Sequence, residues 1–334
     1  MSALPAISIR VSGAIGPRRC VALAQMAEEA GLVGIWFAEN PFQRGIMATA
    51  GACAAATTRL RIGVGVVNPS MRHPVQIAME FAALDELSGG RAILGIGSGI
   101  AGALRRMGFD TSRPVAAVSE AIEIIRALLA GQSATLSGRV FEVHGARLDF
   151  SARRLPIYMA AGSERALKIC GAVADGFIVS NMTPPGLTRQ MAAVVAEAAI
   201  EAGRPKPWIV QYVPCAVAAD GETARRAVKA AIAEALMLLW PAASSWPQRR
   251  EAAAAQSGVP RGDFIAALER LRGGEVAVDV LDERFVSAFA IAGTAPECRR
   301  QAARYREVGV DELALTFAGA QSIDDIAHFA DGLP

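Results

Sequence analysis

The sequence is poor in histidine, cysteine and aromatic residues, and these shortages exclude several kinds of site. Of its 334 residues, three are His and five are Cys, and aromatic residues make up 6%. The cysteines lie far apart and form no C-x-x-C pair, which favours neither a disulfide framework nor a zinc site. We therefore expect buried, reduced thiols and no metal centre.

Neither sign of charge predominates in the chain. Its 34 basic and 32 acidic residues give a net charge of +2. Arginine pairs such as Arg105-Arg106 and Arg249-Arg250 are scattered, most of them within helical patterns that are typical of solvated faces. Because no cluster of cations resembles a track for a phosphate backbone, nucleic acid is not an expected partner.

Long uncharged apolar runs are also missing. The apolar window 227–240 is interrupted by Lys229 and Glu234, whereas a spanning helix needs about 20 mostly apolar residues. Residues 1–11 lack the basic start and apolar stretch of an export signal. These features predict a cytoplasmic protein that makes no membrane contact.

What the chain does have is apolar residues arranged in a repeating order. Hydrophobic residues make up 52%, and short β-branched runs alternate with amphipathic helical stretches. Eight strands alternating with helices predict one α/β domain over 1–334, a (β/α)8 barrel with insertions near 134–152 (hairpins) and 220–285 (helical). The predicted strands are 6–11, 33–38, 61–67, 91–96, 156–159, 176–180, 208–217 and 312–317.

Two glycine-containing loops follow predicted strands and precede helices. The segment 97–102 fits G-x-G-x-x-G, but it follows the fourth strand, and Glu120 lies within a helix, so a dinucleotide-binding fold is disfavoured. The segment 160–165 presents Gly162 and Ser163 at a second helix start. The two loops are either tight turns or a joint site for an anion at backbone N–H groups, and 318–322 is a competing anion loop.

Several longer segments together resemble a known family. They are 61–69, 72–74, 84–91, 94–99, 174–178, 293–297 and 309–313. In this order, over nearly the whole chain, they resemble the bacterial luciferase-like oxidoreductases, most closely the branch of methylene-tetrahydromethanopterin reductase. The resemblance implies the same barrel, with a flavin or deazaflavin at the carboxyl ends of the strands.

The resemblance also implies residues for cofactor binding. By position, a bulge with a non-prolyl cis peptide falls at Gly65-Val66 on the third strand and supports the tricyclic ring; a barrel strand with small residues for packing is the alternative. The residues assigned to cofactor binding are Gly65, Val66, Asn68, Gly97, Ser98, Gly99, Ala161, Gly162, Ser163 and Glu164.

Three further side chains are candidates for chemistry. Glu39 and Asn40 end the second strand as catalytic candidates, although Asn40 replaces the His of many relatives and cannot accept a proton as imidazole does. A barrel-mouth salt bridge is the alternative role for Glu39. Arg10 ends the first strand and suggests an anionic group on the substrate or cofactor. His73 precedes Pro74 and is expected to cap a helix.

The predicted function is that of an oxidoreductase that uses coenzyme F420, a deazaflavin, for hydride transfer to or from a small organic substrate. One alternative is an FMN-dependent monooxygenase of the same family, and another is a flavin-binding barrel without turnover. We also expect a homodimer. Trp240, Pro241, Trp246 and Pro247 suggest a pocket lid, an oligomer contact or core packing.

Overall fold

Eight parallel strands close into a barrel in the computed structural model, which describes residues 4–240, 248–318 and 323–330, with only the backbone at 323–325. Each strand pairs with the next around the ring, and β9 closes it by pairing with both β8 and β11. The predicted (β/α)8 barrel is therefore confirmed. The barrel strands are β1 (Ala6–Ser12), β2 (Gly34–Ala38), β3 (Arg61–Val67), β4 (Ala92–Ile96), β7 (Ile157–Ala160), β8 (Gly176–Val179), β9 (Trp208–Val217) and β11 (Glu312–Phe317).

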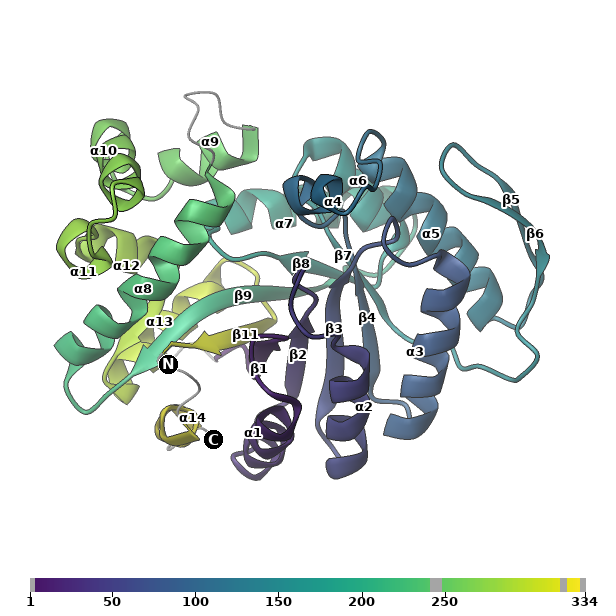
Figure 1. Cartoon of the computed structure of the whole chain (residues 1–334), viewed down its shortest axis with the longest axis horizontal. Coiled ribbons are helices and arrows are strands. Elements are labelled where there is room, and N and C mark those ends of the chain that lie inside the picture. Colours follow the sequence, from purple (N-terminus) through teal and green to yellow (C-terminus); the bar gives the residue numbers. More distant parts are fainter. Residues whose placement is uncertain (1–3, 241–247, 319–322, 331–334) are drawn as a thin grey trace.

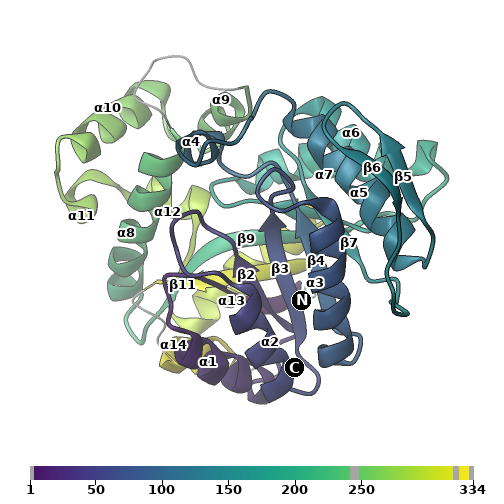
Figure 2. The same ribbon diagram turned by 45° about the vertical axis from the view of Figure 1, so that its right-hand side comes forward.

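Helices surround this ring and cover its outer face (Figures 1 and 2). Several begin with a proline in the first turn. Proline is tolerated there because the N–H groups of the first turn make no hydrogen bond within the helix. The helices between barrel strands are α1 (Pro17–Glu29), α2 (Met47–Ala56), α3 (Pro74–Ser88), α4 (Ala101–Arg106), α5 (Pro114–Leu129), α6 (Glu164–Val173), α7 (Pro185–Glu201) and α13 (Ala295–Glu307), and α14 (Ile323–Ala330) follows β11.

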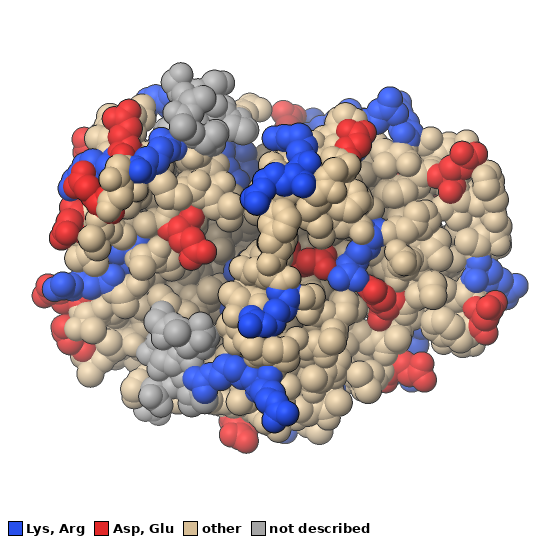
Figure 3. All heavy atoms as spheres, in the orientation of Figure 1, with Lys and Arg blue, Asp and Glu red and all other residues tan. Residues whose placement is uncertain are grey.

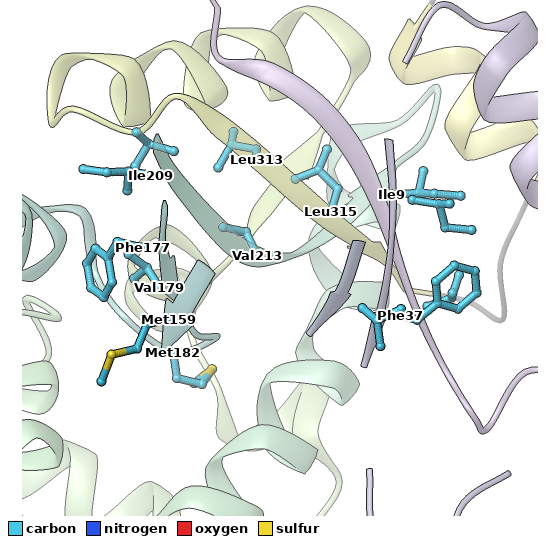
Figure 4. Packing of buried hydrophobic residues seen from close by; sticks show 14 of the residues in the cluster. Ile9, Phe37, Met159, Phe177, Val179, Met182, Ile209, Val213, Leu313 and Leu315 are labelled. Carbon is cyan, nitrogen blue, oxygen red and sulfur yellow. The ribbon is translucent and has the colours of Figure 1, made fainter. Parts of the chain in front are cut away.

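The strands bury two separate apolar layers. On β1, Ile7, Ile9 and Val11 belong to the layer between the strands and the helices, part of which Figure 4 shows. A smaller cluster fills the inside of the barrel, with members from β2, β4, β7, β8, β9 and β11: Trp36, Ile93, Tyr158, Ile178, Val210, Tyr212 and Ala314. Because side chains alternate along a strand, Ser8 and Arg10 of β1 face this interior.

A buried carboxylate closes the amino-terminal end of the barrel. Glu312 is fully buried at the start of β11 and accepts hydrogen bonds from Ser8 Oγ (2.5 Å) and Trp36 Nε1 (2.8 Å). Trp208 Nε1 donates to its other oxygen at 3.2 Å, and Arg61 forms a 2.8 Å ion pair with that oxygen. Both oxygens are thus satisfied, as a buried charge requires.

The local structure differs from the prediction in three places. The short helix α4 begins within the 97–102 segment, at Ala101, and was not predicted, because its six residues give too little periodicity. One hairpin, β5 (Ala134–Ser137) with β6 (Glu142–Ala146), stands where several were predicted. The short strand β10 (Ile291–Gly293) pairs with the end of β9 outside the barrel and was also missed.

The predicted helical insertion gathers at one side of the barrel and the β5–β6 hairpin at the opposite side (Figure 1). Trp240 packs against Phe264 and Phe289 and is 1% exposed, which makes core packing its role. Residues 241–247, including Pro241, Trp246 and Pro247, lie outside the described residues. The insertion consists of α8 (Gly221–Leu239), α9 (Gln248–Ala255), α10 (Arg261–Arg272), α11 (Ala277–Val280) and α12 (Glu283–Phe289).

Charges of both signs are interspersed over the face in Figure 3, without a field of one sign. No helix in the described part of the chain is both long enough and apolar enough to cross a membrane. All five cysteines lie in described segments, where they are buried and form no disulfide, as predicted.

Candidate active site

A cavity of about 420 Å³ opens at the carboxyl ends of the barrel strands, a volume in the range of small-ligand sites. Its wall comes from β1, from the ends of β2, β3, β7 and β8, from the loop after β4, from β9 inside the barrel and from the helices above. Figures 1 and 2 place α4 and α9 at this end of the molecule. The carboxyl end is where barrel enzymes place their active sites.

Most of the predicted site residues line this one cavity, although they are distant in sequence. They are Arg10, Glu39, Asn40, Gly65, Val66, Asn68, Ser98, Gly99, Ala161, Gly162 and Ser163.

Gly97 and Glu164 do not line the cavity. Gly97 is buried behind its wall, where an added Cβ would lie 3.1 Å from Val66 Cγ2 and 3.2 Å from Ala160 Cβ. The Glu164 side chain is 73% exposed and pairs with Lys168 one helical turn along α6 at 2.9 Å. Their assignment to direct cofactor contact therefore has no support in the geometry.

The third strand carries a bulge under the cavity. Its register with β4 shifts between Val64 and Val67, and the peptide bond between Gly65 and Val66 is cis, at the position that the resemblance implied. The Tyr212 hydroxyl donates a 3.3 Å hydrogen bond to the Gly65 carbonyl from the opposite side of the barrel. Burial raises the Tyr212 pKa well above its usual range, so the phenol stays protonated and donates.

Glu39 is held in place by an arginine and keeps one oxygen without a partner. Arg72 donates to Glu39 Oε1 from Nη2 at 2.7 Å and from Nε at 3.1 Å, and it also pairs with Glu80. Glu39 Oε2 is buried at the cavity with no hydrogen-bond partner among the described residues. The salt-bridge alternative is thus present, yet an acceptor remains for a ligand.

Asn40 and His73 take the roles that their side chains permit. Asn40 Nδ2 donates to Gln43 Oε1 at 3.3 Å in a partly exposed loop. His73 Nδ1 accepts from the Val75 N–H at 3.3 Å, so it caps α3 as predicted. His73 faces a neighbouring cavity of about 370 Å³ and does not line the larger one.

The glycine loop after β4 forms one edge of the cavity. Gly99 has a φ of +61°, which an L side chain rarely adopts, and a Cβ there would lie 2.8 Å from Asn68 Nδ2. Asn68 is itself fixed, since its Oδ1 accepts the Ser70 N–H at 2.7 Å. The loop thus brings backbone and the Asn68 amide together, which only glycine at 99 allows.

Arg10 enters the cavity from inside the barrel. Its Nη1 donates to Thr316 Oγ1 at 3.2 Å, and its guanidinium lies 4.7 Å from the centre of the Tyr212 ring. Burial lowers the Arg10 pKa, although Tyr212 opposes this effect. Within the described part of the chain, its buried Nε has no hydrogen-bond partner and no carboxylate forms an ion pair with Arg10. A buried cation in this state is suited to an anionic or acceptor group of a ligand.

Among the cavity-wall residues that sequence reasoning missed are the polar side chains of Asn181, Tyr212, Arg249 and Arg250. Asn181 Oδ1 is buried without a partner among the described residues. The Arg249-Arg250 pair was visible in the sequence but was interpreted as a solvated helical face. Instead, both arginines face the cavity from α9. The sequence does carry a signal for the two arginines. Within α9, no acidic residue lies three or four positions from Arg249, where it could pair with it on the helix surface, and the acid of this helix, Glu251, is directly next to the pair.

A barrel mouth with a cradle of small residues, apolar walls and unpartnered buried polar atoms defines a site for an organic cofactor and a small substrate. The model of the Luciferase-like monooxygenase family matches residues 2–312, and the chain belongs to that family.

Two curated relatives and one solved structure illustrate the likeness. The chain is 31% identical to the 5,10-methylenetetrahydromethanopterin reductase of Methanolobus tindarius over 299 residues, which is 87% of either chain. It is also 31% identical over 224 residues to an F420-dependent glucose-6-phosphate dehydrogenase of Nocardia farcinica, covering 61% of this chain and 66% of that one. The coenzyme F420 dependent tetrahydromethanopterin reductase of Methanopyrus kandleri superposes with a TM-score of 0.86 over 99% of both chains at 24% identity.

Proposed function

We propose that this protein is an oxidoreductase that uses coenzyme F420 for hydride transfer to or from a small organic substrate. The observation that carries the proposal is its 31% identity, over 87% of its length, to a reductase. The glucose-6-phosphate dehydrogenase relative and the Methanopyrus reductase are both named as F420-dependent enzymes.

The residues present suit a flat tricyclic ring. Apolar side chains that include Val66, Met159 and Ile178 supply faces for a ring, and Gly65 and Gly99 add space beside them. The polar edge of such a ring carries both hydrogen-bond donors and acceptors. Its donors could bind to Glu39 Oε2 and Asn181 Oδ1, two buried acceptor atoms that have no partner within the described chain. These atoms are costly to bury unless a ligand satisfies them.

Each polar side chain has a separate task in this proposal. Tyr212 holds the β3 bulge through the Gly65 carbonyl, and Arg72 orients Glu39 toward the ring edge. Asn40 offers an amide to a carbonyl group, and Arg10 faces the negative end of the substrate. When bound, the deazaflavin supplies or accepts a hydride at C5 of its ring, and the protein contributes position and exclusion of water.

The cavity offers no imidazole for proton transfer, since none of its described lining residues is histidine. The carboxylate of Glu39 is bound to Arg72, and the Tyr212 phenol is held protonated by burial. This set favours hydride transfer to an electrophilic carbon over oxidation of an alcohol, which needs a base at the hydroxyl.

Cofactor binding and anaerobic turnover test the proposal together. Purified protein is titrated with F420 and, separately, with FMN, and affinity is read from the change in cofactor fluorescence. We expect F420 to bind at least tenfold more tightly, and Glu39→Gln to weaken F420 binding about tenfold, close to 1.4 kcal/mol. Glu86→Gln, at an exposed position of α3, is the matched control.

The outcomes separate the three functions. Reoxidation of reduced F420 by a set of electrophilic acceptors without oxygen supports the proposal. Tight binding of FMN with no affinity for F420 would overturn it in favour of a monooxygenase, which the description of the family model supports. Bound F420 that no acceptor reoxidises would favour a binding protein without turnover. The homodimer and the cytoplasmic location stay predictions.

A further inference from the structure

Two consecutive arginines at the start of α9 line the cavity without an acidic partner. Arg249 Nη2 donates to Ser180 Oγ at 2.6 Å and to Thr183 Oγ1 at 3.0 Å, both neutral groups. The Arg250 guanidinium lies 5.2 Å from the centre of the Trp240 ring. No ion pair between either arginine and a described carboxylate exists, whereas Arg72 in the same mouth holds two.

The electrostatics of this pair are unfavourable in the protein alone. Burial and, to a smaller extent, the nearby charge of Arg250 together lower the pKa of Arg249 to about 10. Burial also lowers the pKa of Arg250 to about 10. Both side chains stay cationic at neutral pH, so two like charges share a half-buried wall. An anion bound between them removes this repulsion and supplies the missing partner.

The loop after β7 is shaped to accept the Arg249 side chain. A Cβ at Gly162 would lie 2.8 Å from Arg249 Cδ and 3.1 Å from its Nη1, so the arginine crosses this loop in direct contact with the backbone. Ser163 caps α6 at the same place, and its Oγ accepts the Ala166 N–H at 3.3 Å. The guanidinium therefore lies beside the positive end of a ten-residue helix, which also favours an anion.

We propose that Arg249 and Arg250, with the Ser180 and Thr183 hydroxyls and the start of α6, form a subsite for an oxyanion, a phosphate or carboxylate group. The proposal rests on the proposed function in one respect, because the anion belongs to a ligand of the same cavity. The group has two sources: the phosphate-linked tail of the coenzyme, or an anionic end of the substrate.

The experiment measures binding to the full chain and its variants. Arg249→Gln and Arg250→Gln keep side-chain length and remove the charge, and Arg226→Gln on the exposed face of α8 is the matched control. In one arm, calorimetry follows inorganic phosphate binding to the protein alone and to protein saturated with coenzyme. In the other, fluorescence compares F420 with its chromophore that carries the ribityl chain but no phosphate.

Each result assigns or overturns the subsite. A tenfold or greater loss of F420 affinity in Arg249→Gln, with unchanged affinity for the chromophore, assigns the subsite to the coenzyme tail. A similar loss of phosphate affinity in the saturated protein, with F420 affinity unchanged, assigns it to the substrate. Arg249→Lys should restore part of either affinity, since it keeps the charge but not the paired donors.

Two further results bear on the proposal itself. If both glutamine variants bind phosphate and F420 as the wild type and Arg226→Gln do, the subsite is wrong. If the protein binds no deazaflavin but loses phosphate binding only in the Arg249 and Arg250 variants, the subsite stands and the proposed function fails. Equal urea midpoints for all variants ensure that each result reports binding rather than folding.

Discussion

The two ends of the barrel treat buried polar groups in opposite ways, and β1 contributes to both. At the amino-terminal end, Ser8 helps to satisfy Glu312, whose oxygens receive donors from four side chains. At the carboxyl end, Arg10 Nε of the same strand and one oxygen of Glu39 have no hydrogen-bond partner among the described residues. One end completes its hydrogen bonds within the protein, and the other leaves bonds for a ligand to make.

This difference separates stability from function within one fold. A complete network adds to folding and specifies how the strands meet, whereas unmade bonds cost free energy until a ligand supplies partners. Substitutions at the amino-terminal end should therefore change unfolding, and substitutions at the mouth should change binding. Each prediction below tests one side of that comparison.

The largest effect is expected at the amino-terminal end. Glu312→Gln removes the charge that Arg61 pairs with and forces an amide N–H₂ toward donors, which should lower the free energy of unfolding by about 3–5 kcal/mol. Urea unfolding measures this loss. Glu275→Gln, in an exposed pair with Arg270, should lower the free energy of unfolding far less, because water screens that pair.

If Glu312→Gln does not fold, Trp208→Phe removes a single donor and should cost about 1 kcal/mol. In either variant the F420 affinity of the folded protein should stay within about twofold, an estimate that assumes independence of distant sites. A large loss of affinity at normal stability would mean that the two ends are coupled.

At the mouth, Arg10→Met should show the opposite result, with turnover reduced and the free energy of unfolding maintained. The free energy of unfolding should stay level or rise by up to about 1 kcal/mol, because an unpaired buried cation is removed. Turnover with an acceptor identified by anaerobic reoxidation should fall tenfold or more in kcat/KM, about 1.4 kcal/mol. A loss of more than about 2 kcal/mol in stability would show that Arg10 supports the fold instead.

The glycine loop allows a comparison of two neighbouring positions. Gly99→Ala should cost about 1–2 kcal/mol, because φ is positive there and the new Cβ meets the Asn68 amide. Gly102→Ala, in α4 with open space around it, should gain up to about 1 kcal/mol from helix propensity. F420 binding should weaken in the first variant alone. Equal thermal midpoints for both would contradict this interpretation of the loop.

The barrel and much of its mouth could be predicted because their signals are local. Runs such as 61–67 are β-branched and bounded by turns, and parallel strands in a barrel bring their carboxyl ends together. The loops after the strands therefore met at one cavity, with Glu39, Asn68 and Gly99 among them. The bulge at Gly65-Val66 came from resemblance, since periodicity alone does not reveal it.

What could not be predicted depends on contacts between distant residues. The pattern of α9 gives a helix but does not say that Arg249 and Arg250 turn toward the barrel, because that follows from how the insertion packs. Tyr212 bonds a carbonyl 147 positions away, and Ser8 bonds Glu312 across 304 positions. In the sequence, both are ordinary polar residues within apolar strands.

Glu120 is a carboxylate with several hydrogen bonds that lies close to solvent. It therefore tests whether burial or the number of hydrogen bonds determines how much a carboxylate contributes to the free energy of unfolding. Glu120 on α5 accepts the N–H groups of Arg139 (2.7 Å), Val140 (3.0 Å) and Phe141 (3.0 Å) at the hairpin turn. Burial alone would raise its pKa, but these three bonds outweigh it and lower the pKa. Its contribution should be complete above about pH 4.3, the usual pKa of glutamate, and be lost as pH falls through the lower folded value.

Glu120→Gln should therefore lower the free energy of unfolding by about 1 kcal/mol or less, because water competes for these bonds. We expect this small loss even though the Glu120 carboxylate accepts as many hydrogen bonds as a buried carboxylate would need. The protection of the 139–141 amides, taken relative to the intrinsic exchange rate at the same pH, should fall in this variant near neutral pH, and in the wild type only under acid. Glu123→Gln, exposed one turn along α5, should change neither. A cost as large as that of Glu312→Gln would mean that the count of hydrogen bonds matters more than burial, and the contrast between the two ends would then rest on bonding alone.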